Sequence, residues 1–114
     1  MESPLLNKSL EFATKIVLFY EEYAKSKRDT TIAKQLLRSA TSVGANINEA
    51  IYGNSKPDFI AKLHIALKEC SESEYWLELL IESGYYADKS ILDKCIEVKK
   101  LLISSLNTAK QNNE

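Results

Sequence analysis

Apolar residues recur at alternating steps of four and three positions through four long segments of this chain, and few residues interrupt them. In the third segment the pattern runs unbroken from Phe59 to Leu80. Such spacing places the apolar side chains on one face of an α-helix. Only three glycines and two prolines occur in 114 residues, and no segment alternates apolar and polar residues as a strand does. The sequence therefore predicts an all-α protein.

The ends of the four helices are indicated by residues that start or stop helices. Ser3 followed by Pro4 is a typical start. Gly53 and Gly84 are expected to end the second and third helices, Gly53 in the left-handed conformation. Because short connections make consecutive helices antiparallel neighbours, we expect a single-domain, antiparallel up-down-up-down four-helix bundle over residues 1–114. The predicted helices cover residues 4–25, 30–52, 56–83 and 89–109.

The chain lacks the residue patterns of common enzyme and metal sites. His64 is the only histidine and no glutamate precedes it by three positions, which excludes the Glu-x-x-His pairs of di-iron bundles. Cys70 and Cys95 lie within apolar stripes and without metal-ligand spacing, so we expect two buried, reduced thiols and no zinc site. Glycine-rich phosphate loops are absent too. The sequence predicts a protein that is not an enzyme and has no metal, cofactor or small-molecule substrate.

The location of the protein is indicated by its beginning and by its hydropathy. Met1 is followed by acidic and polar residues without the basic and apolar regions of a signal peptide. No apolar run approaches the roughly 20 residues that a membrane span needs. We expect a cytoplasmic protein without membrane contact.

Charge is unevenly distributed along the chain, although the net value is −1. Residues 25–68 carry +5, residues 69–114 carry −4 and residues 1–24 carry −2. Such a distribution can produce a basic face on a nearly neutral protein, although an ordinary solvated surface is the alternative. Because no aromatic residue is interleaved with the basic ones, we expect little base specificity. The candidate nucleic-acid-binding residues are Lys25, Lys27, Arg28, Lys34 and Arg38.

The first and fourth helices each carry two adjacent apolar stripes, which is more than one bundle seam requires. The second stripes consist of Leu6, Leu10, Ala13, Val17, Tyr20 and Ala24, and of Leu92, Ile96, Ile103 and Leu106. The excess predicts either a subunit interface or a wider core. We favour an interface, because large exposed apolar patches are uncommon on soluble monomers.

The second helix also carries a polar stripe, whose small serines would allow another helix to approach closely. Its members are Gln35, Ser39, Ser42, Asn46 and Glu49. If that approach buries Asn46 and Glu49, they need hydrogen-bond partners, and Glu72 and Tyr75 on the third helix are the expected ones. Glu74 is a similar exception, since its stripe also holds Ile60, Leu67 and Ile81.

Two blocks of the sequence resemble a known family. The first is the run QLLRSATSVGANINEA at residues 35–50, and the second contains Phe59, Lys62-Leu63, Ile65-Ala66, Glu69, Glu72 and Tyr75-Trp76-Leu77. Together they resemble the bacterial four-helix-bundle proteins that are encoded in intervening sequences of 23S ribosomal RNA genes and are often labelled S23 ribosomal proteins. By position, the matching residues, with a structural or interface role, are Arg38, Ser39, Ser42, Asn46, Glu49, Glu69, Glu72 and Trp76.

The resemblance implies assembly and a binding function. Members of that family form homopentamers, and the related accessory variability protein of diversity-generating retroelements binds nucleic acid and a reverse transcriptase through a basic surface. We therefore expect a non-enzymatic homo-oligomer, a pentamer, that binds structured RNA or a nucleoprotein partner. The alternative is a protein–protein adaptor or structural oligomer without nucleic-acid contact, which the near-neutral charge of the chain favours.

Overall fold

The computed structural model describes residues 3–86 and 88–111, which form four α-helices. Ser3 caps the first helix with its side chain, which accepts a hydrogen bond from the Leu6 amide, and Ser55 caps the third in the same way. The described residues contain no β-strand, so the predicted all-α class is confirmed. The helices are α1 (Pro4–Lys25), α2 (Thr31–Ile51), α3 (Lys56–Glu82) and α4 (Ser90–Gln111).

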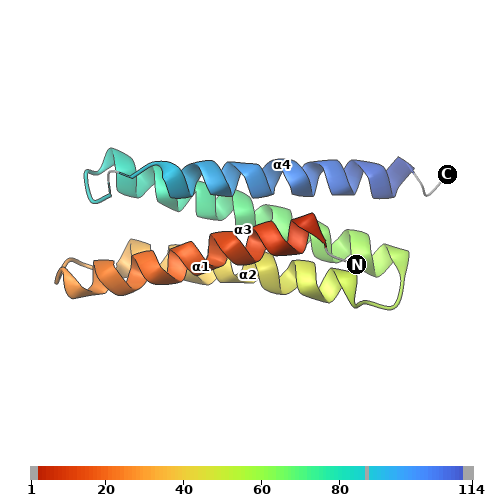
Figure 1. The fold of residues 1–114 in the computed structure, drawn as a ribbon, viewed down its shortest axis with the longest axis horizontal. Helices are drawn as coiled ribbons and strands as arrows, with labels where there is room; N and C mark the ends of the chain where they lie inside the picture. The colour runs from red at the N-terminus through yellow and green to blue at the C-terminus, as the bar shows by residue number, and fades with distance from the viewer. Residues whose placement is uncertain (1–2, 87, 112–114) are drawn as a thin grey trace.

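Consecutive helices run in opposite directions (Figure 1). Ion pairs between helices show the same order: Arg38 on α2 contacts Glu72 on α3, whereas Glu49, further along α2, contacts Lys62, nearer the start of α3. Helices α1 and α3 each pack against both α2 and α4. The result is the expected antiparallel four-helix bundle, with extents of 51 × 22 × 21 Å. The α1–α2 and α3–α4 loops lie at the same end of it (Figure 1).

One apolar stripe of each helix faces the interior of the bundle, as the periodicity predicts. On α3 every stripe member from Leu63 to Leu80 is buried. Burying one large apolar side chain contributes roughly 1.5–3 kcal/mol, so this layered core is the main source of stability. Its fully buried large side chains include Phe12, Ile16, Leu36, Ile47, Leu77, Val98 and Leu102.

The second apolar stripes of α1 and α4 differ in their burial. On α4 the stripe is buried or half-buried except at Ile103, which is 42% exposed. On α1, in contrast, Leu10 is 65% and Val17 is 45% exposed. The wide stripe of α4 therefore belongs largely to the core. The stripe of α1 is exposed at Leu10 and Val17, although Leu6 and Tyr20 pack partly against the core.

Two loop residues adopt the left-handed backbone conformation, and Gly53 is not one of them. Gly84 after α3 has φ +78°, and Lys27 in the α1–α2 loop has φ +62°. The predicted left-handed conformation of Gly53 is therefore wrong. Glycine fits there for another reason, because a Cβ atom would displace the Asp58 carboxylate and lie in tight contact, at 3.1 Å, with the carbonyl oxygen of Glu49.

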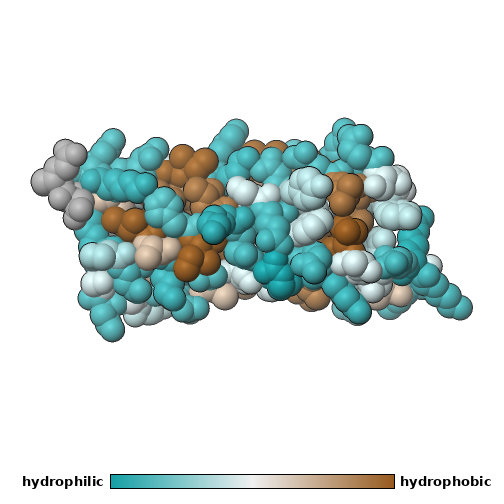
Figure 2. Space-filling view, turned by 180° about the vertical axis from the view of Figure 1, so that it is seen from behind, coloured by the Kyte–Doolittle hydropathy of each residue, from teal (hydrophilic) through white to brown (hydrophobic). Residues whose placement is uncertain are grey.

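The surface of the bundle is mixed in polarity. Figure 2 shows the side that faces away from the viewer in Figure 1, where hydrophobic areas toward the two ends are separated by hydrophilic residues. Across residues 3–86 and 88–111, no helix has the length and apolar character needed to cross a membrane.

Candidate functional site

A network of polar side chains joins α2 to α3 and contains four residues of the family pattern. Arg38 donates through Nη1 to Glu69 Oε2 at 3.0 Å and through Nη2 to Glu72 Oε2. Trp76 Nε1 donates to the same Glu72 oxygen at 3.0 Å. Because the three α3 residues are spaced three and four positions apart, one helix face presents them all to Arg38. We call Arg38, Glu69, Glu72 and Trp76 the Arg38 network.

The single cation of the Arg38 network is shared by its two carboxylates. The hydrogen bond from Trp76, and then the hydrogen bond and charge of Arg38, lower the pKa of Glu72. The hydrogen bond to Glu72, supported by the one to Glu69, raises the pKa of Arg38. A guanidinium that already binds two carboxylates has few donors left for a phosphate. We therefore assign the network to holding α2 against α3.

The lowered pKa of Glu72 makes a pH-dependent contribution to stability. Because the pKa is lower in the folded than in the unfolded chain, ionised Glu72 stabilises the fold above the unfolded pKa, and this stabilisation is lost as the pH falls through the folded pKa. We expect the wild type to be more stable than Glu72→Gln at pH 7, and the difference to shrink below about pH 4. Urea unfolding at each pH measures it. The same substitution at exposed Glu78 is the matched control, and an equal pH dependence in both variants would contradict the assignment.

Next to the Arg38 network, two buried hydroxyls join the same helices. Ser39 Oγ and Ser73 Oγ are 2.7 Å apart, and both residues are fully buried. Each hydroxyl also lies within hydrogen-bond distance of a carbonyl oxygen of its own helix, at 3.2 Å from Leu36 and 2.9 Å from Glu69 respectively. Small hydroxyl residues therefore let α2 and α3 approach closely while their polar atoms stay paired.

The hydroxyl pair predicts a non-additive double-mutant cycle. Ser39→Ala or Ser73→Ala alone should destabilise the fold by about 1 kcal/mol, because the remaining hydroxyl loses a buried partner. The double substitution should cost less than the sum of the two, since either single substitution already breaks the hydrogen bond between the hydroxyls. Urea unfolding of the four proteins measures the coupling, and strict additivity would show that the two hydroxyls act independently.

The rest of the polar stripe on α2 makes shorter-range contacts. Ser42 Oγ donates to the carbonyl oxygen of Arg38 at 2.9 Å, and Asn46 Nδ2 donates to that of Ser42 at 2.8 Å. Asn46 is half-buried, and its hydrogen-bond partner lies on its own helix. Glu49 is exposed but pairs with Lys62 of α3 at 3.1 Å. Two members of the stripe thus bridge α2 to α3, Ser39 through Ser73 and Glu49 through Lys62.

The partners predicted on α3 for this stripe are wrong. Glu72 is bound by Arg38 and Trp76, and Tyr75 is 59% exposed. Glu74, the other polar exception, forms an ion pair with Lys99 of α4. That pair explains why a carboxylate is tolerated in an otherwise apolar stripe.

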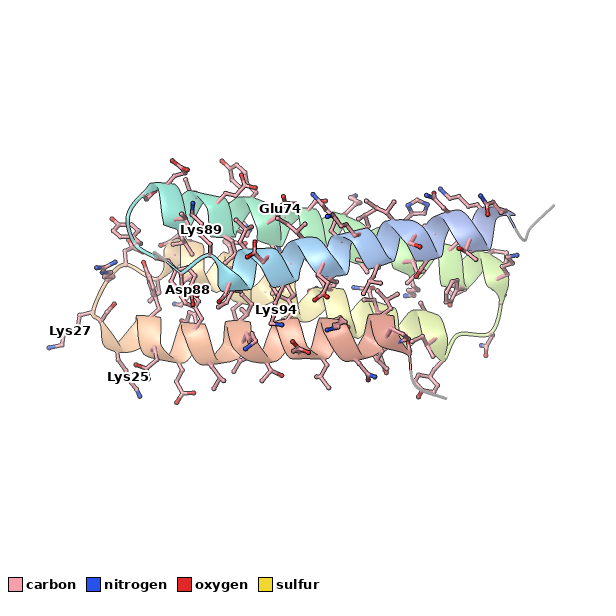
Figure 3. All side chains as sticks on the ribbon, turned by 45° about the horizontal axis from the view of Figure 1, so that its top comes forward. Lys25, Lys27, Glu74, Asp88, Lys89 and Lys94 are labelled. Carbon is pink, nitrogen blue, oxygen red and sulfur yellow. The ribbon has the colours of Figure 1, made fainter. Side chains whose placement is uncertain are left out.

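The structure separates the five candidate nucleic-acid-binding residues into two places. One of them, Arg38, lies two turns into α2 and belongs to the Arg38 network. Among the others, Lys25 pairs with Glu22 at 3.4 Å, and Lys27 projects from the end of the bundle (Figure 3). The four remaining residues form what we call the loop cluster, at the end of α1, in the α1–α2 loop and in the first turn of α2: Lys25, Lys27, Arg28 and Lys34.

Two tyrosines of the α3–α4 loop lie beside the loop cluster. Arg28 Nη1 donates to the carbonyl oxygen of Tyr85 at 3.1 Å, and its guanidinium carbon lies 5.3 Å from the centroid of the Tyr85 ring. Tyr86 is more buried, and burial, followed by the charge of Asp88, raises its pKa to about 12. The hollow at this point has a volume of about 270 Å³, and its aromatic lining consists of Phe19, Tyr23, Tyr85 and Tyr86.

An aromatic side chain therefore lies beside the basic residues in space, although none is interleaved with them in the sequence. Arg28 and Tyr85 are 57 positions apart in the sequence, and the antiparallel topology brings their two loops to one end of the bundle. The pair Tyr85-Tyr86 directly after the predicted end of the third helix was the signal that could have indicated this neighbourhood.

A groove between α1 and α2 borders the exposed stripe of α1. A Cβ atom on Gly44, in the middle of α2, would lie 3.6 Å from Ser9 Oγ, which is an ordinary contact. Packing within the subunit therefore does not require glycine, although glycine in a helix is roughly 0.5–1 kcal/mol less favourable than alanine. The groove has a volume of about 390 Å³ and is lined by Leu6, Ser9, Leu10, Ala13, Thr41, Gly44, Ala45 and Asn48. We call the surface formed by Leu6, Leu10, Ala13 and Val17 the α1 apolar face.

The part of the chain that the structure describes gives little support for a catalytic site. His64 is exposed. In residues 3–86 and 88–111 no group of three or more histidine, cysteine, aspartate or glutamate residues is placed to hold a metal ion. The absence of enzymatic activity remains a prediction.

The fold and its contacts between helices define a small four-helix-bundle protein whose family-pattern residues mainly join α2 to α3. The chain belongs to the 23S rRNA-intervening sequence protein family, whose model matches residues 2–104. It is similar to the crystal structure of a protein of unknown function from the S23 ribosomal protein family of Bacteroides thetaiotaomicron, with 48% identity and a TM-score of 0.86 over 90% of this chain and 97% of the other. Comparison with curated proteins gives no significant match. The family predicted from the two sequence blocks is thus confirmed.

Proposed function

We propose that this protein is a non-enzymatic, cytoplasmic bundle that assembles with copies of itself into a pentamer through the α1 apolar face. The exposure of Leu10 (65%) and Val17 (45%) carries the proposal. Apolar surface contributes roughly 25 cal/mol for each Å² removed from water, so this face favours association. The pentamer is the assembly that the family resemblance implies.

The groove beside the α1 apolar face supports a helix of a second copy as the occupant. Its α2 wall consists of small or short side chains, and close helix packing depends on such residues. Gly44 lowers the stability of α2, and packing inside the subunit does not require it. The close approach of a helix from another copy would explain why glycine occupies this position. Light scattering at micromolar concentration should then give a mass of about five times 12.9 kDa. A monomer over a wide concentration range would rule the assembly out.

A second candidate function, binding of structured RNA, rests on the loop cluster. Five cations elsewhere on the bundle pair with carboxylates of neighbouring helices, whereas no ion pair of the described residues involves Lys27 or Lys34. Other lysines, such as Lys15 and Lys68, are equally without an ion pair among those residues, so it is the position of Lys27 and Lys34 in the loop cluster that singles them out. The nearby acid Asp29 lies just before α2, where its Oδ1 accepts hydrogen bonds from the Thr31 amide at 2.8 Å and hydroxyl at 2.6 Å, and the charge of Lys34 also helps to lower its pKa. The two unpaired lysines are therefore available to phosphates.

Assembly would strengthen such binding. A ring of copies repeats the loop cluster around an axis, so a modest charge per subunit becomes a large local field and several contacts act together. Tyr85 adds a half-exposed ring on which an unpaired base can stack. Stacking tolerates every base, so low base specificity remains the expectation. A titration with structured RNA and duplex DNA at several salt concentrations tests this function, and a lack of binding to either would favour the adaptor alternative.

A further inference from the structure

The two cysteines of the chain face each other in the core. Cys70 on α3 and Cys95 on α4 are both fully buried, and their Sγ atoms are 3.9 Å apart. Cys70 Sγ lies 3.4 Å from the carbonyl oxygen of Cys95, and Cys95 Sγ lies 3.5 Å from that of Cys70. Because each short side chain reaches the backbone of the other helix, α3 and α4 approach each other closely in this layer.

We infer that Cys70 and Cys95 form a reversible disulfide that locks α4 onto α3 when the protein meets a peroxide. A disulfide bond is about 2.0 Å long, so the sulfur atoms, now 3.9 Å apart, must come about 1.9 Å closer. Rotation of the two side chains can supply much of that movement. The chain has no other cysteine, so no other pairing competes within one molecule. If these positions served only to fill the core, any two small apolar residues would be sufficient. Cysteine instead occupies both of the facing positions.

Hydrogen peroxide suits this site because it is small and uncharged. One cysteine, as its thiolate, attacks a peroxide oxygen; the O–O bond breaks, a sulfenic acid forms, and the departing hydroxide takes up the proton that the thiol released. The second thiol then attacks the sulfenic sulfur. The S–S bond forms, and the sulfenic hydroxyl leaves as water with the proton of the second thiol. Two thiols and one peroxide thus give one disulfide and two waters.

Local opening of α4 should control the rate of this reaction. The hydrogen bond with Cys70, followed by burial, holds the pKa of the Cys95 thiol well above its usual value. The closed, buried site therefore disfavours the Cys95 thiolate and excludes solvent, and oxidation proceeds from molecules in which the α3–α4 layer has loosened. Once formed, the disulfide closes the loop from residue 70 to residue 95 and restricts further opening. The disulfide would thus form in molecules whose α3–α4 layer has loosened, and would then hold α4 against α3.

The test treats the reduced, full-length protein with hydrogen peroxide and follows its mass and thiol content. The wild type should lose about 2 Da, retain no thiol when assayed in denaturant, and run as a single chain on a non-reducing gel. Dithiothreitol should restore both thiols. Oxidation should be faster in urea below the unfolding midpoint, and the oxidised form should have a Tm higher by about 5 °C or more.

Single-cysteine variants provide the controls. Cys70→Ser and Cys95→Ser each leave one thiol, which should gain about 16 or 32 Da as its oxygen acids form, or should link two chains. Cys70→Ala and Cys95→Ala replace them if serine prevents folding. The inference is wrong if the native wild type keeps both thiols under conditions that fully oxidise the urea-unfolded chain. It is equally wrong if the wild type gains oxygen without forming the disulfide within the chain.

Discussion

Substituting glutamate for Leu10 and Val17 together is expected to convert the assembled protein into monomers. Within one subunit both side chains are exposed, at 65% and 45%, so the new carboxylates should disturb the fold little. In the assembly the same carboxylates would be buried without partners, which destabilises an interface by several kcal/mol. A loss of about 4 kcal/mol weakens association about a thousandfold. Light scattering should then show a mass near 12.9 kDa in place of about five times that value.

A matched substitution on another helix controls for the added charge. Ile65 on α3 is 43% exposed, close to the exposure of Val17, and lies outside the α1 apolar face. Ile65→Glu should keep the mass of the wild type, and circular dichroism should show full helix content in both proteins. If the Leu10→Glu/Val17→Glu protein keeps the assembled mass, or if Ile65→Glu dissociates it equally, the α1 apolar face is not the contact between subunits.

The helices themselves could be predicted because each one carries its own pattern. The stripe from Leu63 to Leu80 determines which side of α3 is buried, whatever that side packs against. Cap residues and glycines then set the ends, and the observed helix boundaries lie within two residues of those expected from the sequence. Periodicity also showed that α1 carries a second apolar stripe, which the structure exposes at Leu10 and Val17. It could not show that the similar stripe of α4 is mostly absorbed by the core.

Contacts between helices could not be predicted in the same way, because they depend on the axial register of two helices and on side-chain conformation. Glu74 looks misplaced in its own stripe, and only the register of α3 against α4 reveals Lys99 as its partner. Arg38 looks like part of a basic cluster, yet the register of α2 against α3 gives it two carboxylates. Tyr85 reaches Arg28 only because both loops share one end of the bundle.

Reversing the charge of the loop cluster, with Lys27→Glu, Arg28→Glu and Lys34→Glu combined, should weaken RNA binding by roughly a factor of ten or more. Each lost phosphate contact also removes the release of a condensed counterion, so a log–log plot of affinity against salt should become less steep by roughly 0.7–0.9 per contact. Titrations of structured RNA at several salt concentrations measure both quantities. Lys110→Glu, a single charge reversal at the exposed end of α4, is the control for position and should leave both quantities unchanged.

Lys27→Gly separates the effect of charge from that of folding. Lys27 holds φ +62°, a conformation that costs a side-chain-bearing residue about 1–2 kcal/mol and glycine almost nothing. The variant should therefore fold with equal or greater stability in urea unfolding while it loses one phosphate-binding charge. Weaker RNA binding in a more stable protein would assign the loss to the lysine side chain. If the affinity is unchanged while the stability rises, Lys27 does not contact the RNA.

The role of Tyr85 in the proposed RNA binding can be tested separately. If its ring stacks on an unpaired base, Tyr85→Leu should weaken binding of a hairpin with a single-stranded loop by a factor of about ten or more, and should change binding of a fully paired duplex much less. Arg28 depends on the same residue, because it donates to the Tyr85 carbonyl at 3.1 Å, but leucine keeps that backbone acceptor. The substitution therefore removes the ring and leaves the hydrogen bond. Equal losses for hairpin and duplex would indicate that Tyr85 only positions Arg28 for phosphates, and no loss for either would leave the lysines as the whole contact. If neither RNA binds the wild type at low salt, the loop cluster is a solvated surface, and the α1 apolar face, which does not depend on it, is what remains for a protein–protein adaptor to use.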